Sequence, residues 1–194
     1  VADVVTGLED LAAEELRRLG AAPVAPGRGE VRFDHGQVGA VLRRSRLASA
    51  VYRALFFDVP RPKALLGDAA HRRLAAAARE VAAAGGMRSF RLAAAGADSP
   101  VFLRLADSLT AATGLVHDPD EGELLARFRR AGAGWEVLLR LTPRPLSTRA
   151  WRVCNLPGGA NATVAAAMAD LAGPGGSYLN LMCGSGTLLV ERAL

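Results

Sequence analysis

The sequence ends on a pattern that permits few local folds. A strand-like run at residues 177–182 leads to Gly184-Ser185-Gly186, and a helix-like run, LLVERAL, completes the chain. Two glycines let a backbone pass close to a ligand, and a helix that starts at once leaves amides free in its first turn. This order is typical of nucleotide or cofactor sites in α/β enzymes. Because the helix only begins where the chain stops, we expect the chain to be a piece of a longer protein.

Residue types around this turn exclude three common sites. A P-loop requires a Gly-Lys-Ser/Thr ending, and the turn contains no Lys. A dinucleotide fingerprint requires a third glycine where Leu189 stands, and a nucleophile elbow requires the order Gly-x-Ser-x-Gly. A strand–Gly-x-Gly–helix turn remains, and by itself this pattern also fits a plain β-turn-α connection.

The first 60 residues carry the pattern of a compact βαββαβ unit. Thr6 and Glu9 have the spacing of a capping box, and leucines at helical spacing then run to Gly20. Residues 21–34 suggest a hairpin, and a second helix and a strand follow. Two helices on one face of a four-stranded antiparallel sheet are the ferredoxin-like arrangement. We predict a ferredoxin-like domain over residues 1–60.

Prolines mark two further boundaries, near Pro60 and near residues 142–147. Between them the pattern predicts helices at 71–84 and from Pro100, a strand at 89–96 and a β-hairpin at 123–141. We therefore predict an α/β domain over residues 61–146, with a sheet separate from the first. Residues 147–194 are predicted to form a linker, a helix capped by Asn161, and the terminal strand and glycine turn.

Composition excludes several classes of protein. Hydrophobic residues make up 51% and charged residues 22%, as in soluble globular proteins. No run of residues is long and apolar enough for a membrane span, and the start has no signal-peptide pattern. We predict a cytoplasmic protein without a membrane partner. Two cysteines and three scattered histidines predict neither a disulfide framework nor a metal site.

The stretch MCGSGTLLVE is similar to the first cofactor motif of class I S-adenosylmethionine-dependent methyltransferases. With GLEDLAAEEL, RPLSTRAWRV and NATVAAAMADLA, it appears in an order that resembles the THUMP-domain RNA methyltransferases over essentially the whole chain. The resemblance implies a ferredoxin-like domain, a THUMP RNA-binding domain over 61–146, and the first strand and helix of a truncated Rossmann-like methyltransferase fold. The family includes tRNA and ribosomal RNA guanine-N2 methyltransferases, of which tRNA is the more frequent substrate.

The resemblance also implies a set of residues that bind S-adenosylmethionine. Gly184 and Gly186 would lie against the cofactor, and the neighbouring candidates are Thr163, Asn180, Cys183, Ser185 and Thr187. Asn180 stands where the family usually has Asp, and Leu181 where it has Pro, so the charge that receives the cofactor's ammonium is missing. The family's catalytic motif and its ribose-binding acid lie further along the fold. No catalytic residue is assigned to this chain, and we expect it to bind the cofactor weakly or not at all by itself.

Basic residues accumulate in the middle segment. Residues 61–146 contain 13 Arg and Lys against 9 acids, whereas residues 1–60 contain 8 Arg and 8 acids. Arg suits phosphate and base recognition, so we predict a polyanionic partner, with tRNA favoured over ribosomal RNA. The predicted RNA contacts are Arg61, Lys63, Arg72, Arg73, Arg127, Arg129, Arg130, Arg140 and Arg144. Arg43, Arg44 and Arg46 in the first domain form a competing cluster.

Three hypotheses therefore stay open from the sequence. The first is the RNA-binding front end of an RNA methyltransferase, inactive by itself. The second is a DNA adenine-N6 or other amino-methyltransferase, which shares the same cofactor turn. The third is a non-enzymatic RNA-binding module, which the departures at Asn180 and Leu181 favour.

Overall fold

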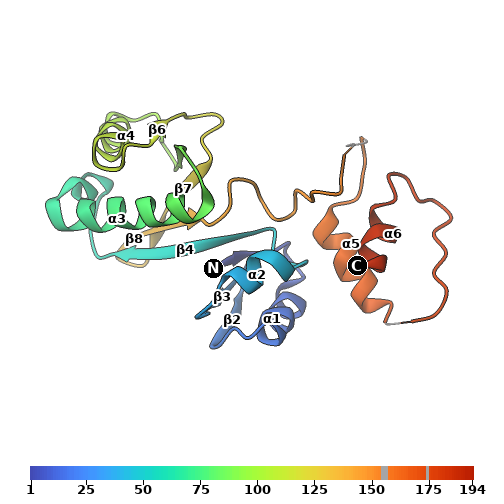
Figure 1. The fold of residues 1–194 in the computed structure, drawn as a ribbon. Coiled ribbons are helices and arrows are strands. Elements are labelled where there is room, and N and C mark those ends of the chain that lie inside the picture. The colour runs from blue at the N-terminus through green and yellow to red at the C-terminus, as the bar shows by residue number, and fades with distance from the viewer. Residues whose placement is uncertain (154–156, 174) are drawn as a thin grey trace. The chain divides into compact units, whose positions relative to one another are not determined.

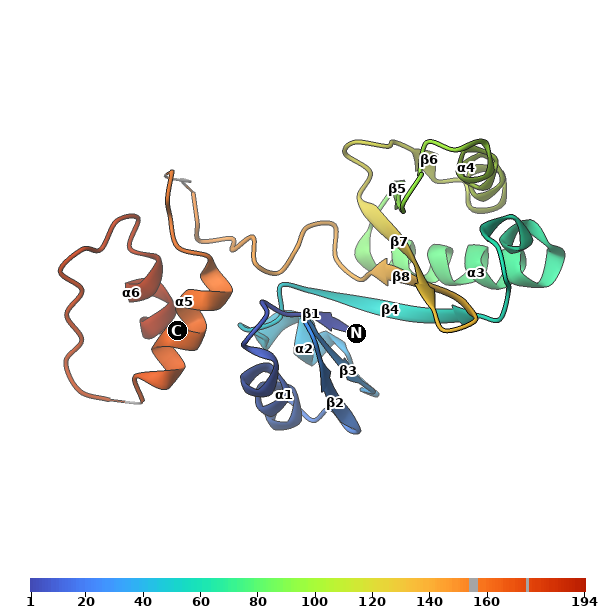
Figure 2. The ribbon, with the colours of Figure 1, turned by 180° about the vertical axis from the view of Figure 1, so that it is seen from behind.

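The structure is a computed structural model that describes residues 1–153, 157–173 and 175–194. Cys154 lies outside the described residues. The chain divides into two compact units, one formed by residues 1–51 with 145–194 and the other by residues 52–144. Figures 1 and 2 show the elements of both units from opposite sides.

The N-terminal segment has the predicted element order. It comprises β1 (Ala2–Asp3), α1 (Glu9–Arg18), β2 (Val24–Gly27), β3 (Glu30–Phe33), α2 (Gly39–Arg44) and β4 (Ala50–Phe57). The strands follow the order β2-β3-β1-β4, and all neighbours are antiparallel. Leu16 of α1 and Val31 of β3 are fully buried and mark the core of this layer.

The predicted capping box at the start of α1 is wrong. The helix begins at Glu9, after Leu8, without a side-chain cap. The Glu9 carboxylate instead accepts hydrogen bonds from the Gly7 amide at 2.7 Å and the Gly29 amide at 2.8 Å. Gly29 has φ +72, a left-handed conformation that favours glycine. Glu9 therefore connects the start of α1 to the β2–β3 turn. The Gly29 amide donates to the Glu9 carboxylate in place of the predicted Thr6 amide.

The second unit contains η1 (Pro62–Leu66), α3 (Asp68–Gly85), β5 (Ser89–Ala93), α4 (Pro100–Thr113), β6 (Val116–His117), β7 (Leu124–Ala131) and β8 (Gly134–Arg140). The two helices and the hairpin agree with the prediction, and Gly86 ends α3 with φ +65. Leu74, Leu105, Leu124 and Leu139 belong to one apolar core, which α3 and α4 form with one face of the strands. Figure 1 shows both helices in this unit.

The prediction of two separate sheets is wrong, because β4 serves both units. Ala50 and Val51 pair with β1, whereas residues 52–57 pair antiparallel with β8. The hydrogen-bonded order is therefore β2-β3-β1-β4-β8-β7-β5-β6. The division between the units falls within this strand, between Val51 and Tyr52, ahead of the proline boundary. A strand as long as β4 offers hydrogen-bonding groups to a different neighbour along each half of its length.

The C-terminal segment forms helices but lacks the predicted strand. Asn161 caps α5 (Ala162–Leu171) as expected, and α6 (Thr187–Ala193) follows the glycine turn. The described residues 175–182 form no strand, and Leu179, Leu181 and Met182 are 80%, 87% and 91% exposed. A strand requires a hydrogen-bonded neighbour, and none of the described strands pairs with this run. Of the expected first strand and helix, only the helix forms.

Candidate functional site

The glycine turn takes a conformation that its two glycines make accessible. Gly184 has φ +53 and Gly186 has φ +72, so both lie in the left-handed region. The Gly186 amide donates to the Cys183 carbonyl at 2.8 Å, and Gly186 is the residue that precedes α6. The hydroxyl groups of Ser185 and Thr187 lie 2.9 Å apart and connect the turn to the first residue of the helix.

The remaining predicted cofactor residues are placed less uniformly. The Asn180 side-chain oxygen accepts from the Met182 amide at 3.2 Å, and Cys183 is exposed. Thr163 is fully buried, and both its amide and its hydroxyl donate to the Asn161 side chain, at 2.9 and 2.6 Å. The Thr163 hydroxyl therefore completes the cap of α5. This is the structural role that such a first-turn hydroxyl commonly has.

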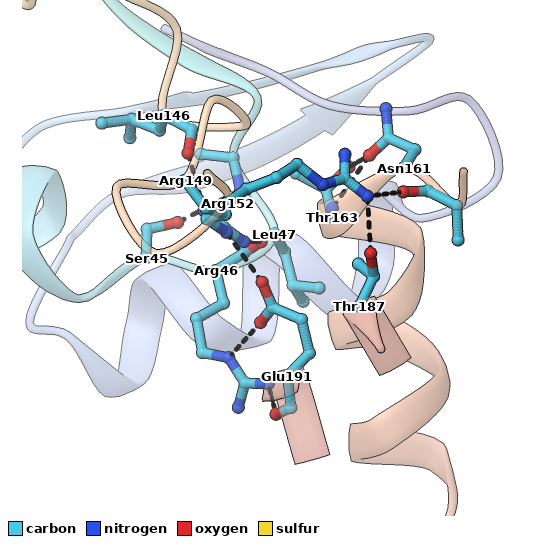
Figure 3. Close-up of polar contacts among 12 residues, drawn as sticks. Ser45, Arg46, Leu47, Leu146, Arg149, Arg152, Asn161, Thr163, Thr187 and Glu191 are labelled. Atoms are coloured by element: carbon cyan, nitrogen blue, oxygen red, sulfur yellow. Dashed lines mark hydrogen bonds and ion pairs between the residues drawn. The ribbon is translucent and has the colours of Figure 1, made fainter. Parts of the chain in front are cut away.

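Arg152 brings the starts of α5 and α6 together, as Figure 3 shows. One terminal nitrogen of its guanidinium donates to the Ala160 carbonyl and to the Thr187 hydroxyl, each at 2.6 Å. Ala160 lies just before the cap of α5, and Thr187 is the first residue of α6 and only 2% exposed. The predicted cofactor residues near positions 163 and 187 thus lie in two segments that Arg152 connects. Arg152 itself was not predicted as a site residue.

A buried carboxylate lies at the other end of α6. Glu191 is 0% exposed, and its two oxygens accept from Arg46 Nε at 3.0 Å and from Arg149 Nε at 2.8 Å. A terminal nitrogen of Arg46 also donates to the backbone carbonyl of Glu191. Figure 3 shows these contacts between α6, the α2–β4 connection and residue 149. Sequence reasoning placed Arg46 in a basic cluster and missed Glu191, although the three arginines of RPLSTRAWRV signalled a need for an acidic partner.

A second buried carboxylate fixes the turn that carries Arg46. Glu15 of α1 is 8% exposed and accepts from the Ser45 hydroxyl at 2.6 Å and from the amides of Arg46 and Leu47 at 2.8 and 3.2 Å. Arg149 donates to the Arg46 carbonyl at 2.6 Å. Hydrogen bonds therefore run without interruption from α1 through residues 45–47 to the end of α6.

The predicted RNA contacts fall into two groups at opposite ends of the β4–β8 pair. At the Phe57 end, Arg73 donates to the Phe56 carbonyl at 2.8 Å, and Arg130 donates to the Pro60 carbonyl at 2.7 Å. Their guanidinium groups lie 5.1 Å from the Phe57 ring and 5.9 Å from the Trp135 ring. The Phe56 side chain is 49% exposed beside them. Three further predicted contacts are exposed. Arg61 precedes η1, Lys63 lies on η1, and Arg72 lies near the start of α3.

The group at the Tyr52 end is mostly engaged within the protein. Arg127 donates to the Tyr52 hydroxyl at 2.9 Å and lies over its ring. Arg129 belongs to the Phe57 end, where it pairs at 2.7 Å with the buried Glu136, the residue opposite Phe56. Arg140 corrects the prediction, because it is only 3% exposed and donates to the carbonyls of Glu123, Thr142 and Pro143. Burial lowers the pKa of Arg140. Arg144 is exposed. Arg140 is therefore a structural residue and not a phosphate contact.

Two negative observations apply to the part of the chain that the structure describes. None of its helices is long and apolar enough to cross a membrane. Its His, Cys, Asp and Glu side chains do not gather into a group of three that could hold a metal ion.

Comparison with known proteins identifies what the C-terminal segment is similar to. Residues 149–194 match the family UPF0020, described as RMKL-like, methyltransferase domain. The structure of TrmN from Thermus thermophilus is 28% identical and has a TM-score of 0.71, and the match covers 99% of this chain and 60% of that one. The expected likeness to a methyltransferase is confirmed for residues 149–194.

Two more distant structures have a similar fold. A predicted N6-adenine-specific DNA methylase from Listeria monocytogenes is 17% identical with a TM-score of 0.64, over 99% of this chain and 53% of that one. SMU.472, named as a methyltransferase and solved in complex with SAH, is 17% identical with a TM-score of 0.58, over 99% and 54%. The chain therefore spans about 60% or less of the length of these proteins.

Proposed function

We propose that the chain is the RNA-binding front part of an S-adenosylmethionine-dependent RNA methyltransferase, with a ferredoxin-like domain at residues 1–60 and a THUMP domain at 61–146. The parent protein methylates guanine N2, in tRNA rather than ribosomal RNA. The glycine turn forms the first edge of the cofactor site. The catalytic motif lies outside the 194 residues.

One observation carries the cofactor part of this proposal. The Gly-x-Gly turn is tied to α6 through Ser185 and Thr187, and α6 to α5 through Arg152, inside the segment that matches a methyltransferase family. The two left-handed glycines carry no side chains, so that a ligand can approach the backbone closely at both positions. The structural match to TrmN, at 28% identity, covers 99% of this chain and so includes the same segment together with the front end.

The second unit supports the RNA part. Arg61 and Lys63 are exposed just after β4, and Arg72 is exposed on α3 next to Arg73, which donates to the Phe56 carbonyl. The Phe56 side chain is itself 49% exposed. Phosphates bind cations without regard to sequence, whereas exposed aromatic rings and guanidinium planes stack on unpaired bases. Cations together with an exposed ring suit a single-stranded RNA end better than a regular DNA duplex.

Photolabelling with radioactive S-adenosylmethionine tests the cofactor site, because it captures weak binding. The wild-type chain and Gly186→Val are irradiated at matched concentrations. Valine is strained at φ +72, so we expect labelling of the wild type and a loss of about tenfold or more in the variant. Gly158→Val, which changes another glycine with φ +75, is the matched control. Equal labelling of all three proteins would remove the cofactor site from the glycine turn.

A further inference from the structure

The helix that follows the glycine turn is too short to hold its own position. With seven residues, α6 falls below the length at which isolated helices persist in water, and no strand forms ahead of it among the described residues. Its two buried residues are Thr187 and Glu191, which are four positions apart and share one face. Leu189 and Leu194 remain 37% and 71% exposed. α6 packs along α5, and the polar contacts at its two ends add specific attachments to Arg46, Arg149 and Arg152.

The contacts of Glu191 are specific in both charge and direction. A fully buried carboxylate is stable only when it is paired, and here each oxygen receives one guanidinium. Arg46 comes from the α2–β4 connection, which Glu15 of α1 fixes from the other side. Arg149 also donates to the carbonyls of Leu146 and Arg46, so that its orientation is set independently of Glu191.

From this arrangement we infer that Glu191 is a positioning residue, through which the N-terminal segment holds the glycine turn in the geometry that binds the cofactor. We call the contacts of Glu191 with Arg46 and Arg149 the joint; in it, both guanidinium groups donate to the Glu191 carboxylate. Arg152 holds the opposite end of α6 by donating to the Thr187 hydroxyl. The cofactor part of this inference rests on the function proposed above. A substitution in α1 or in residues 45–47 should therefore alter the geometry of the glycine turn, although none of the residues that contact the ligand is changed.

Hydrogen exchange of the full chain, followed by mass spectrometry, tests the joint without any ligand. Glu191→Gln keeps the shape of the side chain and leaves two guanidinium groups without their carboxylate. We expect exchange of the amides of residues 186–194 to rise by about 100-fold, while β2 and β3 keep their protection. The matched control is Glu80→Gln, which removes a carboxylate that is 64% exposed and paired with Arg53.

Two milder variants keep the test readable if Glu191→Gln unfolds the first unit. Arg46→Lys and Arg149→Lys retain the positive charge but lose the planar fork, so each should raise exchange in residues 186–194 less than Glu191→Gln does. If Glu191→Gln unfolds the whole first unit, these Lys variants decide the question. Exchange in residues 186–194 that stays at the wild-type level in Glu191→Gln, or exchange that rises equally in β2 and β3 in the Lys variants, would overturn the positioning role.

Photolabelling of the same variants separates this inference from the proposed function. Loss of labelling in Glu191→Gln, with partial labelling in Arg46→Lys, supports both. A wild-type chain that exchanges as expected but takes no label leaves the joint in place and contradicts the cofactor site. Full labelling of Glu191→Gln despite faster exchange would show that the joint does not position the cofactor turn.

Discussion

Two arginines of the first unit and a basic group of the second unit face opposite surroundings. In the first unit, Arg46 and Arg149 point at a carboxylate that is fully buried, and their own side chains are 26% and 10% exposed. In the second unit, Arg61 and Lys63, which follow β4, and Arg72 of α3 are exposed. Five fixed donors let a guanidinium bridge several acceptors inside a protein, and the same fork binds phosphate at a surface. An Arg-rich sequence therefore does not indicate nucleic-acid binding until the partner of each guanidinium is known.

The largest expected effect comes from Arg140, a buried arginine of the second unit. Arg140→Ala removes a buried side chain and its hydrogen bonds to three backbone carbonyl oxygens. We expect the free energy of unfolding to fall by about 3 kcal/mol, since each lost hydrogen bond costs about 1 kcal/mol. Denaturant unfolding measures the change. Arg144→Ala is the control and should cost less than about 0.5 kcal/mol. If Arg140→Ala lost as little stability as the control, the structural role of Arg140 would be contradicted.

A smaller effect separates arginines that are neighbours in the first unit. Arg46→Ala removes one of the two cations on Glu191 but leaves Arg149, so we expect a loss of about 2 kcal/mol in stability. The double change of the exposed Arg43 and Arg44 to Ala removes more charge and should cost less than about 0.5 kcal/mol. Thermal and denaturant unfolding of both variants provide the comparison. The reverse order of losses would contradict the inward role of Arg46.

The smallest effect concerns a carboxylate held by backbone amides instead of arginines. Hydrogen bonds from the amides of Gly29, of Glu9 itself and of Gly7 lower the pKa of Glu9 below its ordinary value of 4.5. A lowered pKa in the folded state contributes stability that is present above pH 4.5 and lost as the pH falls through the folded-state value. Glu9→Gln should therefore flatten the decline of stability below pH 4.5. Glu14→Gln, on the same helix, should leave that decline unchanged, and an equal response of both variants would contradict the assignment.

The sequence was informative where local patterns decide structure. Helical spacing, proline and glycine signals located the long helices and the β7–β8 hairpin, because these elements depend on neighbours close in the chain. The double pairing of β4 could not be predicted, since it joins residues 52–57 to residues 135–140, far apart in sequence. The predicted strand at 177–182 was wrong for a related reason. Its apolar pattern suits a buried strand, but strand formation depends on a partner that the pattern does not specify.

The same limit applies to the candidate site. The turn at Gly184 and Gly186 could be predicted because glycine spacing encodes a backbone conformation directly. The pairing of Glu191 with Arg46 could not, because the two residues lie 145 positions apart and each also fits an exposed helix face. Arg140 was misassigned for the opposite reason. It was counted among the basic residues of the middle segment, but its guanidinium is buried and donates to nearby backbone carbonyls.

The salt dependence of tRNA binding tests most directly the claim that the outward-facing cations of the second unit bind RNA. Arg61, Lys63 and Arg72 are changed together to Ala, and the matched control changes the exposed Arg17, Arg43 and Arg44, so that both variants lose three charges. Fluorescence anisotropy with labelled tRNA gives the slope of log affinity against log salt. We expect the first variant to flatten the slope by about 2 to 3 and the control to change it by less than about 1. A flatter slope in the control, with the first variant at the wild-type value, would place the RNA on the first unit and contradict the account.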